Sequence, residues 1–269
     1  MKDFHVHTNL SHDGISSMQE YINISKEKNI DEITFTEHYD IYDNINTNLK
    51  TINLDNYYQE YLKYKDNNHV KINFGIEIGL QPHIFNMINS IVNKHDFDFI
   101  IGSSHITCKK DMSVDKSFFI GLTRREAYLK YFNEVLENII LYNNEFDVYG
   151  HLDYVVRYGG YSEKSLDYIE FKDIIDEILI TLINKNKGIE VNTSGIRYGL
   201  GTFHPNIDII KRYKELGGKI ITIGSDAHKT SDLGRDLILV LDMLEIIGFD
   251  SITIFHNRKP EFLKIKDIK

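Results

Sequence analysis

Seven short segments of the chain end in residue types that bind metal ions, and each follows an apolar run typical of a β-strand. Together they contribute His5 and His7, His38, Glu77, His105, His151, Glu190, and Asp226 with His228. In a barrel of parallel strands, the active site lies at the carboxyl ends of the strands and takes one or two side chains from each. The pattern therefore predicts a metal centre at one end of an α/β barrel.

The strongest local motif spans residues 4–14, Phe-His-Val-His-Thr-Asn-Leu-Ser-His-Asp-Gly. Residues two apart on a strand point to the same face, so His5 and His7 can reach one ion. Asp13 follows in a turn closed by Gly14, which lets the loop fold back toward the site. The alternative is a pair of histidines packed in a buried strand. The Asp-Gly that follows the pair favours the metal.

Two further motifs place single ligands on the next strands. In Thr36-Glu37-His38 we expect His38 to be the ligand. Glu37 would face the opposite side, where it either orients an imidazole or forms a surface ion pair. Glu77 is a carboxylate inside an apolar strand, and its burial is costly without a metal or an arginine. A carboxylate can bridge two ions, so Glu77 is the natural centre of a site with several metals.

The remaining ligand candidates repeat one pattern, in which a metal-binding residue follows an apolar run. His105 and His151 could supply two imidazoles to a second ion, and Asp226 and His228 share a face. The candidates are His5, His7, Asp13, His38, Glu77, His105, His151, Asp226 and His228. An open catalytic zinc site uses about three protein ligands, so we expect two or three divalent ions. Histidine and carboxylate donors suit Zn²⁺, Fe²⁺ or Mn²⁺.

The other histidines lack a strand-end position, and we interpret most of them as surface or packing residues. They are His12, His69, His83, His95, His204 and His256. His12 lies close enough to the first motif to touch a substrate.

Strand-like and helix-like segments alternate along the chain, which is typical of a parallel sheet covered by helices. The predicted strands are Asp3–Val6, Glu32–Thr36, Lys71–Ile78, Phe97–Ile101, Phe146–Tyr149, Gly188–Val191, Lys219–Ile223 and Ser251–Phe255. The predicted helices include Ser17–Asn29, Arg124–Tyr142, Phe171–Lys187 and Asn206–Leu216, the last stopped by Gly217-Gly218. Seven or eight strands predict a closed or nearly closed barrel. Two longer connections, Tyr39–Asn56 and Ile106–Thr123, are expected to serve as lids or binding loops.

Composition narrows the class of protein. With 269 residues and 42% apolar content, the chain suits a single barrel domain over residues 1–269. Cys108 is the sole cysteine, which excludes an internal disulfide and favours a reducing, cytoplasmic setting. No apolar run reaches the length of a membrane span, and a strand begins too early for a signal peptide. The net charge of −9 argues against a duplex-DNA binder.

The ordered motifs resemble the PHP (polymerase and histidinol phosphatase) superfamily. They are His-x-His-Thr-x-x-Ser-x-Asp-Gly, Thr-Glu-His, Gly-x-Glu, Ser-His, Gly-His-x-Asp and Ser-Asp-Ala-His, and they cover essentially the whole chain. The resemblance implies a distorted (β/α)7 TIM-like barrel with a trinuclear metal site. One ion would take His5, His7, Glu77 and Asp226; a second, Glu77, His105 and His151; and a third, Asp13, His38 and His228. Some members place a histidine where this chain has Asp13.

Chain length and motif details resemble the histidinol-phosphate phosphatases of that superfamily. This implies hydrolysis of L-histidinol phosphate to L-histidinol and phosphate in histidine biosynthesis. A hydroxide held between two ions at Glu77 would attack phosphorus in line with the leaving alkoxide. We expect Arg157, Arg197 and His12 to contact the phosphate, since arginine matches phosphate geometry.

The proton for the leaving alkoxide could come from Asp226, His228 or a metal-bound water. Asp153, Tyr158 and Tyr161 are candidates for contact with the imidazole and amine. Two alternatives stay open: another PHP phosphoesterase acting on phosphotyrosine or a nucleotide, and a non-catalytic metal-stabilised module. We expect a small phosphorylated substrate and no nucleic-acid or membrane partner. The sequence predicts no oligomeric state.

Overall fold

In the computed structural model, which describes residues 1–43, 45, 47–163 and 166–269, seven parallel strands form one sheet. Their spatial order follows the chain: β1 (Lys2–Val6), β2 (Glu32–Tyr39), β3 (Lys71–Gly79), β4 (Phe99–Ser103), β7 (Val148–Tyr149), β8 (Gly188–Asn192) and β9 (Ile221–Gly224). All neighbouring pairs are parallel. The carboxyl ends of all seven strands therefore meet at one end of the sheet.

The sheet curls until its two outer strands meet. Val6 at the end of β1 forms a parallel bridge with Ala227 just after β9. The amide of His7 donates to the carbonyl of Ala227 at 2.9 Å, and the amide of Ser225 donates to the Asp3 carboxylate at 2.9 Å. This closure confirms the expected distorted (β/α)7 barrel.

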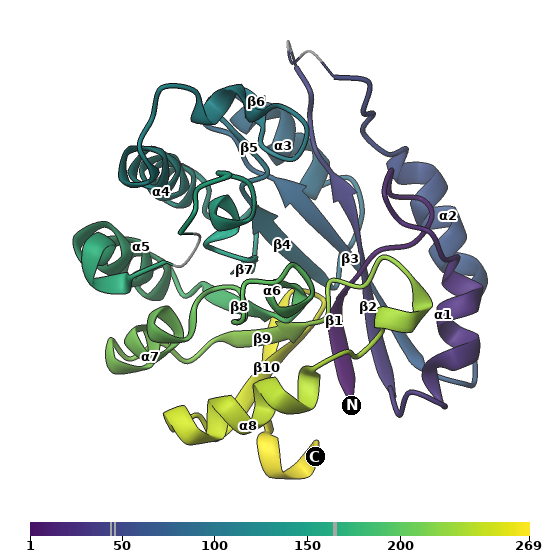
Figure 1. Cartoon of the computed structure of the whole chain (residues 1–269). Coiled ribbons are helices and arrows are strands. Elements are labelled where there is room, and N and C mark those ends of the chain that lie inside the picture. Colours follow the sequence, from purple (N-terminus) through teal and green to yellow (C-terminus); the bar gives the residue numbers. More distant parts are fainter. Residues whose placement is uncertain (44, 46, 164–165) are drawn as a thin grey trace.

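Helices surround the barrel on its outer face (Figure 1). They are α1 (Met18–Ser25), α2 (Leu54–Tyr64), α3 (Phe85–Val92), α4 (Arg124–Leu141), α5 (Lys172–Asn184), α7 (Ile207–Glu215) and α8 (Leu237–Ile247), whereas the short α6 (Ser194–Arg197) lies at the carboxyl end of β8. The predicted helices match α4, α5 and α7 closely, whereas α1 ends at Ser25, four residues before the predicted end. Local signals explain the boundaries: Ser17 and Glu20 form a capping box at the start of α1, and Gly217 follows α7 with φ of 90°.

The eighth predicted strand does not join the barrel. β10 (Ser251–His256) pairs with β11 (Lys259–Lys264) in an antiparallel hairpin. The two residues between them, Asn257 and Arg258, have φ of 50° and 63°, as a tight hairpin turn requires. The amides of both turn residues donate to Asp98, just before β4, so the hairpin covers the amino-terminal end of the barrel. The barrel has seven strands because this segment turns back on itself.

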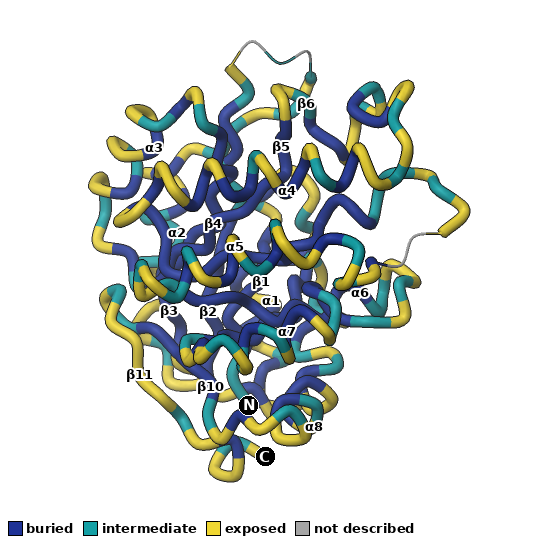
Figure 2. The backbone as a smooth tube through the Cα atoms, turned by 90° about the vertical axis from the view of Figure 1, so that its left-hand side faces the viewer, coloured by how far each residue is buried: buried dark blue, intermediate teal, exposed yellow. Residues whose placement is uncertain are grey.

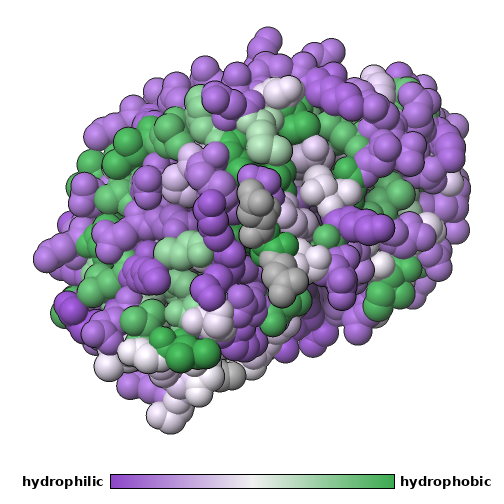
Figure 3. Space-filling view, turned by 90° about the horizontal axis from the view of Figure 1, so that it is seen from above, coloured by the Kyte–Doolittle hydropathy of each residue, from purple (hydrophilic) through white to green (hydrophobic). Residues whose placement is uncertain are grey.

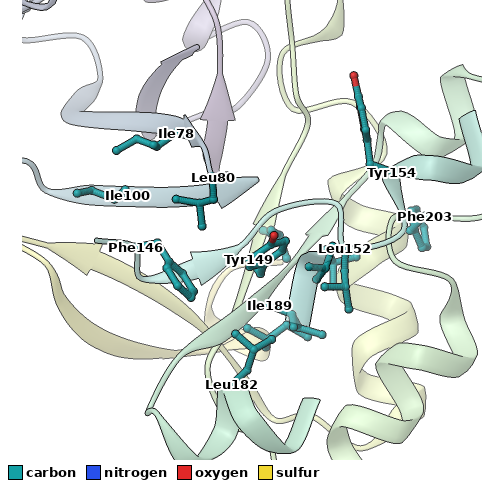
Figure 4. Packing of buried hydrophobic residues seen from close by; sticks show 14 of the residues in the cluster. Ile78, Leu80, Ile100, Phe146, Tyr149, Leu152, Tyr154, Leu182, Ile189 and Phe203 are labelled. Carbon is teal, nitrogen blue, oxygen red and sulfur yellow. The ribbon is translucent and has the colours of Figure 1, made fainter. Parts of the chain in front are cut away.

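The core lies between the barrel strands and the helix layer, where the tube is buried along most of the barrel strands and on the inner helix faces, whereas β11 is exposed (Figure 2). Phe146, Tyr149, Leu182 and Ile189 pack together between β7, β8 and α5 (Figure 4). A smaller cluster joins the barrel strands to β10 through Phe4, Phe99, Ile101, Val148, Ile254 and Phe255. The first cluster packs against the outer face of the strands, and the second packs the β10–β11 hairpin against the amino-terminal end of the barrel.

Both long connections reach the carboxyl end of the barrel. The first supplies Asp40 and Tyr42 to a cavity there, and the second supplies Asp111 and Ser113. The first also contains Asn44 and Asn46, which lie outside the described residues. The second folds into a small hairpin, β5 (Ile106–Thr107) with β6 (Lys110–Asp111).

The surface over this end is mostly hydrophilic, with apolar residues scattered between polar ones (Figure 3). Across the described residues, no helix combines the length and apolar character needed to span a bilayer.

Candidate metal centre

The carboxyl ends of the strands gather the predicted ligands into three adjoining clusters. In the first, the Nε2 atom of His5 lies 2.9 Å from Nε2 of His7, 3.3 Å from Glu77 Oε2 and 3.6 Å from Asp226 Oδ1. His7 Nε2 lies 3.5 Å and 3.4 Å from the same two oxygens. Ligand atoms about 2.0–2.1 Å from a tetrahedral ion lie about 3.3 Å from one another, so these four atoms fit one zinc-sized ion.

The second cluster uses the other oxygen of Glu77. Glu77 Oε1 lies 3.2 Å from His105 Nε2 and 2.8 Å from His151 Nε2, and the two imidazole nitrogens are 3.3 Å apart. The two carboxylate oxygens of Glu77 thus face different sets of imidazoles. This is the arrangement that a bridging carboxylate requires.

The third cluster lies at the cavity mouth. His38 Nε2 is 3.3 Å from His228 Nε2 and 3.6 Å from Asp13 Oδ2, and His228 Nε2 is 3.2 Å from the same oxygen. The ring of His7 stacks on both His38 and His228, with centroids 4.0 and 4.4 Å apart. The structure therefore brings all nine predicted ligands together.

The hydrogen bonds of the histidines show that these clusters suit cations. In His5, Nδ1 faces Glu190 Oε1 at 2.5 Å; in His105, Nδ1 faces Asp40 Oδ1 at 3.0 Å; and in His228, Nδ1 faces the Asp226 carbonyl at 3.0 Å. Each partner is an acceptor, so each neutral ring carries its proton on Nδ1. Each Nε2 then directs a lone pair at a carboxylate oxygen. Lone pairs that converge on carboxylates are stabilised by a metal ion.

The charge balance supports the same interpretation. Glu77 is fully buried, and its Oε2 atom lies 2.9 Å from Nδ1 of His38 without the alignment of a hydrogen bond. Although burial alone raises it, the neighbouring His105, His5 and His38 hold the pKa of Glu77 well below its usual range. Burial opposes a charged His105, but Asp40 and Glu77 raise the pKa of this imidazole to about 10. The pocket thus favours positive charge beside Glu77, and divalent ions would compete with protons for it.

Two carboxylates that the sequence did not assign support the ligands from behind. Glu190 Oε2 accepts from the amide of His151 at 3.1 Å while Oε1 faces His5, so one side chain links two clusters. Asp40 orients His105 in the same way. Both are buried, and such partners fix the ring orientation of a metal-binding histidine. In the sequence, Glu190 lies at the end of an apolar strand-like run, and this position was a signal for the role.

Glu37 holds the loop that carries Asp13. Its carboxylate accepts from the amide and hydroxyl groups of both Thr8 and Ser11, at 2.5–3.1 Å. It is buried, so the alternative of a surface ion pair is wrong. Gly14 permits the same loop to turn, because a Cβ there would lie 1.8 Å from the Thr8 carbonyl oxygen.

The backbone is strained at two of the ligands. His151 and Asp226 have φ of 24° and 54°, a region that non-glycine residues rarely adopt. Such strain is common where the surrounding structure holds a functional side chain in place. Here it turns both side chains back over the ends of β7 and β9.

The clusters open into one cavity, whose wall includes His12, Asp13, His38, Asp40, Tyr42, His105, Asp111, Ser113, His151, Tyr154, Arg157, Tyr158, Tyr198, Asp226 and His228. Arg157 lies beside the metal clusters, with Nη2 3.6 Å from Asp226 Oδ2. His12 is exposed at the mouth. The guanidinium of Arg197 lies behind the wall, where it donates to the carbonyls of Ser225 and Asp226 at 2.8 and 2.7 Å. Arg197 thus supports the Asp226 loop, and its contact with phosphate stays a prediction.

Of the candidates for imidazole and amine contact, Tyr158 lines the cavity, whereas Tyr161 donates to the Leu122 carbonyl and lies outside the lining. Asp153 is turned away from the cavity and bonds His204. The burial of His204 agrees with its interpretation as a packing histidine. This ring is fully buried and connects Asp153 to Arg157. No strand-end pattern marked it, because it lies in an irregular loop.

The barrel and its three ligand clusters define an α/β-barrel protein with a candidate site for several metal ions. Comparison with known proteins agrees with this class. Residues 3–194 match the PHP domain family, and the chain belongs to this family. It is 33% identical to a probable histidinol-phosphatase of Clostridium acetobutylicum, over 90% of this chain and 92% of the relative. It is 30% identical to the histidinol-phosphatase of Lactococcus lactis subsp. lactis, over 99% of this chain and 98% of the relative.

A solved structure is similar over almost the whole chain. The crystal structure of histidinol phosphate phosphatase from Lactococcus lactis subsp. lactis, complexed with zinc, L-histidinol and phosphate, matches with a TM-score of 0.85 at 29% identity. The match covers 97% of this chain and 98% of that chain.

Proposed function

We propose that this protein is a metal-dependent phosphomonoesterase that hydrolyses L-histidinol phosphate to L-histidinol and phosphate. The observation that carries the proposal is the set of three adjoining ligand clusters, two of which share Glu77, beside a cavity that contains Arg157. The full-length similarity to histidinol-phosphatases supports the choice of substrate. The whole chain would act as one PHP domain, and a role in amino-acid biosynthesis suits the cytoplasm.

The residues fit two or three divalent ions of the zinc, iron or manganese type. One ion would take His5, His7, Glu77 and Asp226, and a second Glu77, His105 and His151. A third would take Asp13, His38 and His228. When bound, such ions polarise phosphoryl oxygens and supply hydroxide near neutral pH.

The chain's own side chains then bind and orient the ester. Arg157 offers paired donors to a phosphate next to the clusters, with His12 at the mouth as a further contact. For Arg197 we propose an indirect role, in which its bonds to the Ser225 and Asp226 carbonyls hold the Asp226 loop beside the phosphate. Because the Arg157 guanidinium is held in place, the bound phosphate needs less reorientation before in-line attack.

We propose that the Asp226 carboxylate passes a proton from the attacking water to the leaving alkoxide. Although burial raises it, the neighbouring His5, His7, His228 and Arg157 hold the pKa of Asp226 well below its usual range, so the group is ionised before the reaction. Its Oδ1 faces His5 and His7, but its Oδ2 lies on the side of Arg157 and the cavity. In His228, Nδ1 faces the Asp226 carbonyl and Nε2 faces Asp13, so both ring nitrogens are committed. The geometry therefore favours the carboxylate over the imidazole.

The cavity wall also suits the organic part of histidinol phosphate. Buried Asp40 and Asp111 give that wall negative charge, and Tyr158 adds an aromatic face. The histidinol moiety carries an amine cation and an imidazole, and it has no carboxylate. Phosphotyrosine has a carboxylate that this wall would repel, and nucleotides lack the cationic group.

The test is phosphate release by purified, metal-loaded protein from L-histidinol phosphate, O-phospho-L-tyrosine, a nucleoside monophosphate and p-nitrophenyl phosphate. We expect the highest kcat/KM for histidinol phosphate by at least about 100-fold, which corresponds to about 2.7 kcal/mol of discrimination. Comparable or better turnover of another ester would assign the protein a different substrate. Absence of turnover with fully loaded metals would support a non-catalytic module.

A further inference from the structure

Three hydrogen-bonded side chains run from the cavity wall into the interior of the protein. The Nε atom of Arg157 donates to His204 Nε2 at 2.9 Å, and the other ring nitrogen of His204 bonds Asp153 Oδ1. His204 and Asp153 are 0% and 1% exposed. Neither lines the cavity, whereas Arg157 does. These bonds thus connect a cavity residue to two side chains that no ligand can touch.

The hydrogen bonds define the protonation of His204. A guanidinium only donates, so His204 Nε2 must accept from Arg157. The proton of the neutral ring is then on Nδ1 and is donated to Asp153. Burial lowers the pKa of His204, which agrees with a neutral ring. Asp153 Oδ1 therefore selects the one tautomer that can hold Arg157.

The surroundings of the ring leave it little freedom. The amide of His204 donates to the Asn192 carbonyl at 2.9 Å, and the Asn192 amide donates back at 2.7 Å. These bonds attach the His204 loop to the end of β8. Asp153 Oδ2 accepts from the amide of Asn206 at 2.9 Å, so both carboxylate oxygens are occupied.

Other contacts complete the clamp on the guanidinium. Arg157 Nη2 donates to the Ser194 hydroxyl, and the Tyr198 ring lies 4.3 Å from the guanidinium carbon. Tyr154 lies 5.0 Å away. Within this frame, the bond to His204 is the contact that fixes the Nε edge of the guanidinium plane.

We propose that Asp153 and His204 are positioning residues, which hold the Arg157 guanidinium in the orientation that binds the substrate phosphate. The inference rests on the proposed function as a phosphatase, since it assigns Arg157 to phosphate. Without the bond to His204, the Nε edge of Arg157 would lose its acceptor and the guanidinium could tilt toward Asp226, whose carboxylate is 3.6 Å away. Neither positioning residue touches the substrate.

Two variants at His204 test separately its hydrogen bond with Arg157 and its hydrogen bond with Asp153. His204→Gln places an amide oxygen near the former Nε2 position, so it keeps an acceptor for Arg157. His204→Asn is shorter and keeps a partner for Asp153 but loses the acceptor. A role in positioning therefore predicts that His204→Gln retains phosphate affinity better than His204→Asn.

Asp153→Asn tests the hydrogen bond between Asp153 and His204. An asparagine has one acceptor oxygen, and Asp153 meets two donors, from His204 and from the Asn206 amide. The matched control is Asp147→Asn, in a buried carboxylate that accepts from Ile100 and Arg258 before β7. The control loses a similar buried contact but has no path to Arg157.

The experiment measures binding of inorganic phosphate to metal-loaded protein by isothermal titration calorimetry, with metal content determined on each sample. We expect Asp153→Asn and His204→Asn to weaken phosphate binding about tenfold, as loss of one hydrogen bond to a charged group does. His204→Gln should stay within about threefold of wild type, and Asp147→Asn should match wild type. In an Arg157→Lys background, Asp153→Asn should have no further effect.

Wild-type phosphate affinity in folded, fully loaded Asp153→Asn and His204→Asn would overturn the proposal. An undiminished effect of Asp153→Asn in the Arg157→Lys background would also overturn it, because the residue would then not act through Arg157. If Asp153→Asn does not fold, the His204 pair still decides. Failure of wild type to hydrolyse histidinol phosphate, with these binding differences intact, would refute the proposed substrate and leave the positioning role supported.

Discussion

Glu190 Oε1 lies 2.5 Å from His5 Nδ1, although the two residues are 185 positions apart in the chain. The contact crosses from β8 to β1, and the strand β9 lies between them in the sheet. It is possible because Gly224 on β9 has no side chain: a Cβ there would lie 2.4 Å from His5 Cβ and 2.6 Å from Glu190 Oε1. A glycine on one strand thus allows its two neighbours to meet.

Glu190→Gln should reduce metal affinity and turnover by about 10- to 100-fold, the usual effect of losing a carboxylate behind a metal-binding histidine. The amide can no longer stabilise the imidazole of His5 through a charged acceptor. Metal content after dialysis against a graded chelator, together with kcat, measures this effect.

Glu32→Gln is the matched control for Glu190→Gln. Glu32 is also buried on a barrel strand, but at the amino-terminal end, with Lys2, Asn73 and His256 as partners. It should leave metal affinity unchanged. Equal metal loss in both variants would mean that Glu190 acts only through general stability.

Glu77→Gln should empty or disorder two metal positions at once and abolish turnover. Its two oxygens face separate clusters, and an amide offers one oxygen where two are needed. His151→Asn is the comparison, since His151 belongs to one cluster. Metal per chain by mass spectrometry and phosphate release measure both. Full metal content and activity in Glu77→Gln would refute the bridging role.

Glu37→Gln should lower the free energy of unfolding by about 2 kcal/mol, because an NH2 group replaces an acceptor that faces the buried amides and hydroxyls of Thr8 and Ser11. The loop that carries Asp13 should loosen. Urea denaturation measures the stability, and the metal content reports occupancy of the third cluster. An unchanged unfolding midpoint would contradict the anchoring role of Glu37.

Stability should depend on pH through Glu32. Burial opposes its charge, yet hydrogen bonds from Lys2, Asn73 and His256 lower the pKa of Glu32 to about 2 from 4.5. Because the folded-state pKa is the lower one, the contribution is fully present above pH 4.5 and is lost as the pH falls toward 2. Denaturation of metal-stripped wild type and Glu32→Gln should therefore converge between those two pH values. A constant difference would contradict this assignment.

The sequence predicted the barrel and all nine clustered side chains, because each ligand follows an apolar run and parallel strands align their ends. It could not predict the partners behind the ligands. The contact of Glu190 with His5 depends on how tightly the sheet curls, and His204 reaches Arg157 from an irregular loop. The hairpin of β10 and β11 was missed because a short apolar run does not reveal its direction. Its tight turn has no Asn-Gly signal, since Arg258 follows Asn257.

The central claim is that clustered ions on this barrel carry out phosphate release, and zinc reconstitution tests it most directly. Metal-stripped protein is titrated with Zn²⁺, and kcat for L-histidinol phosphate is measured against zinc bound per chain. The account predicts negligible turnover in the stripped protein and a rise to full activity only as two or three equivalents bind. Full activity without metal, or saturation at one equivalent, would contradict it.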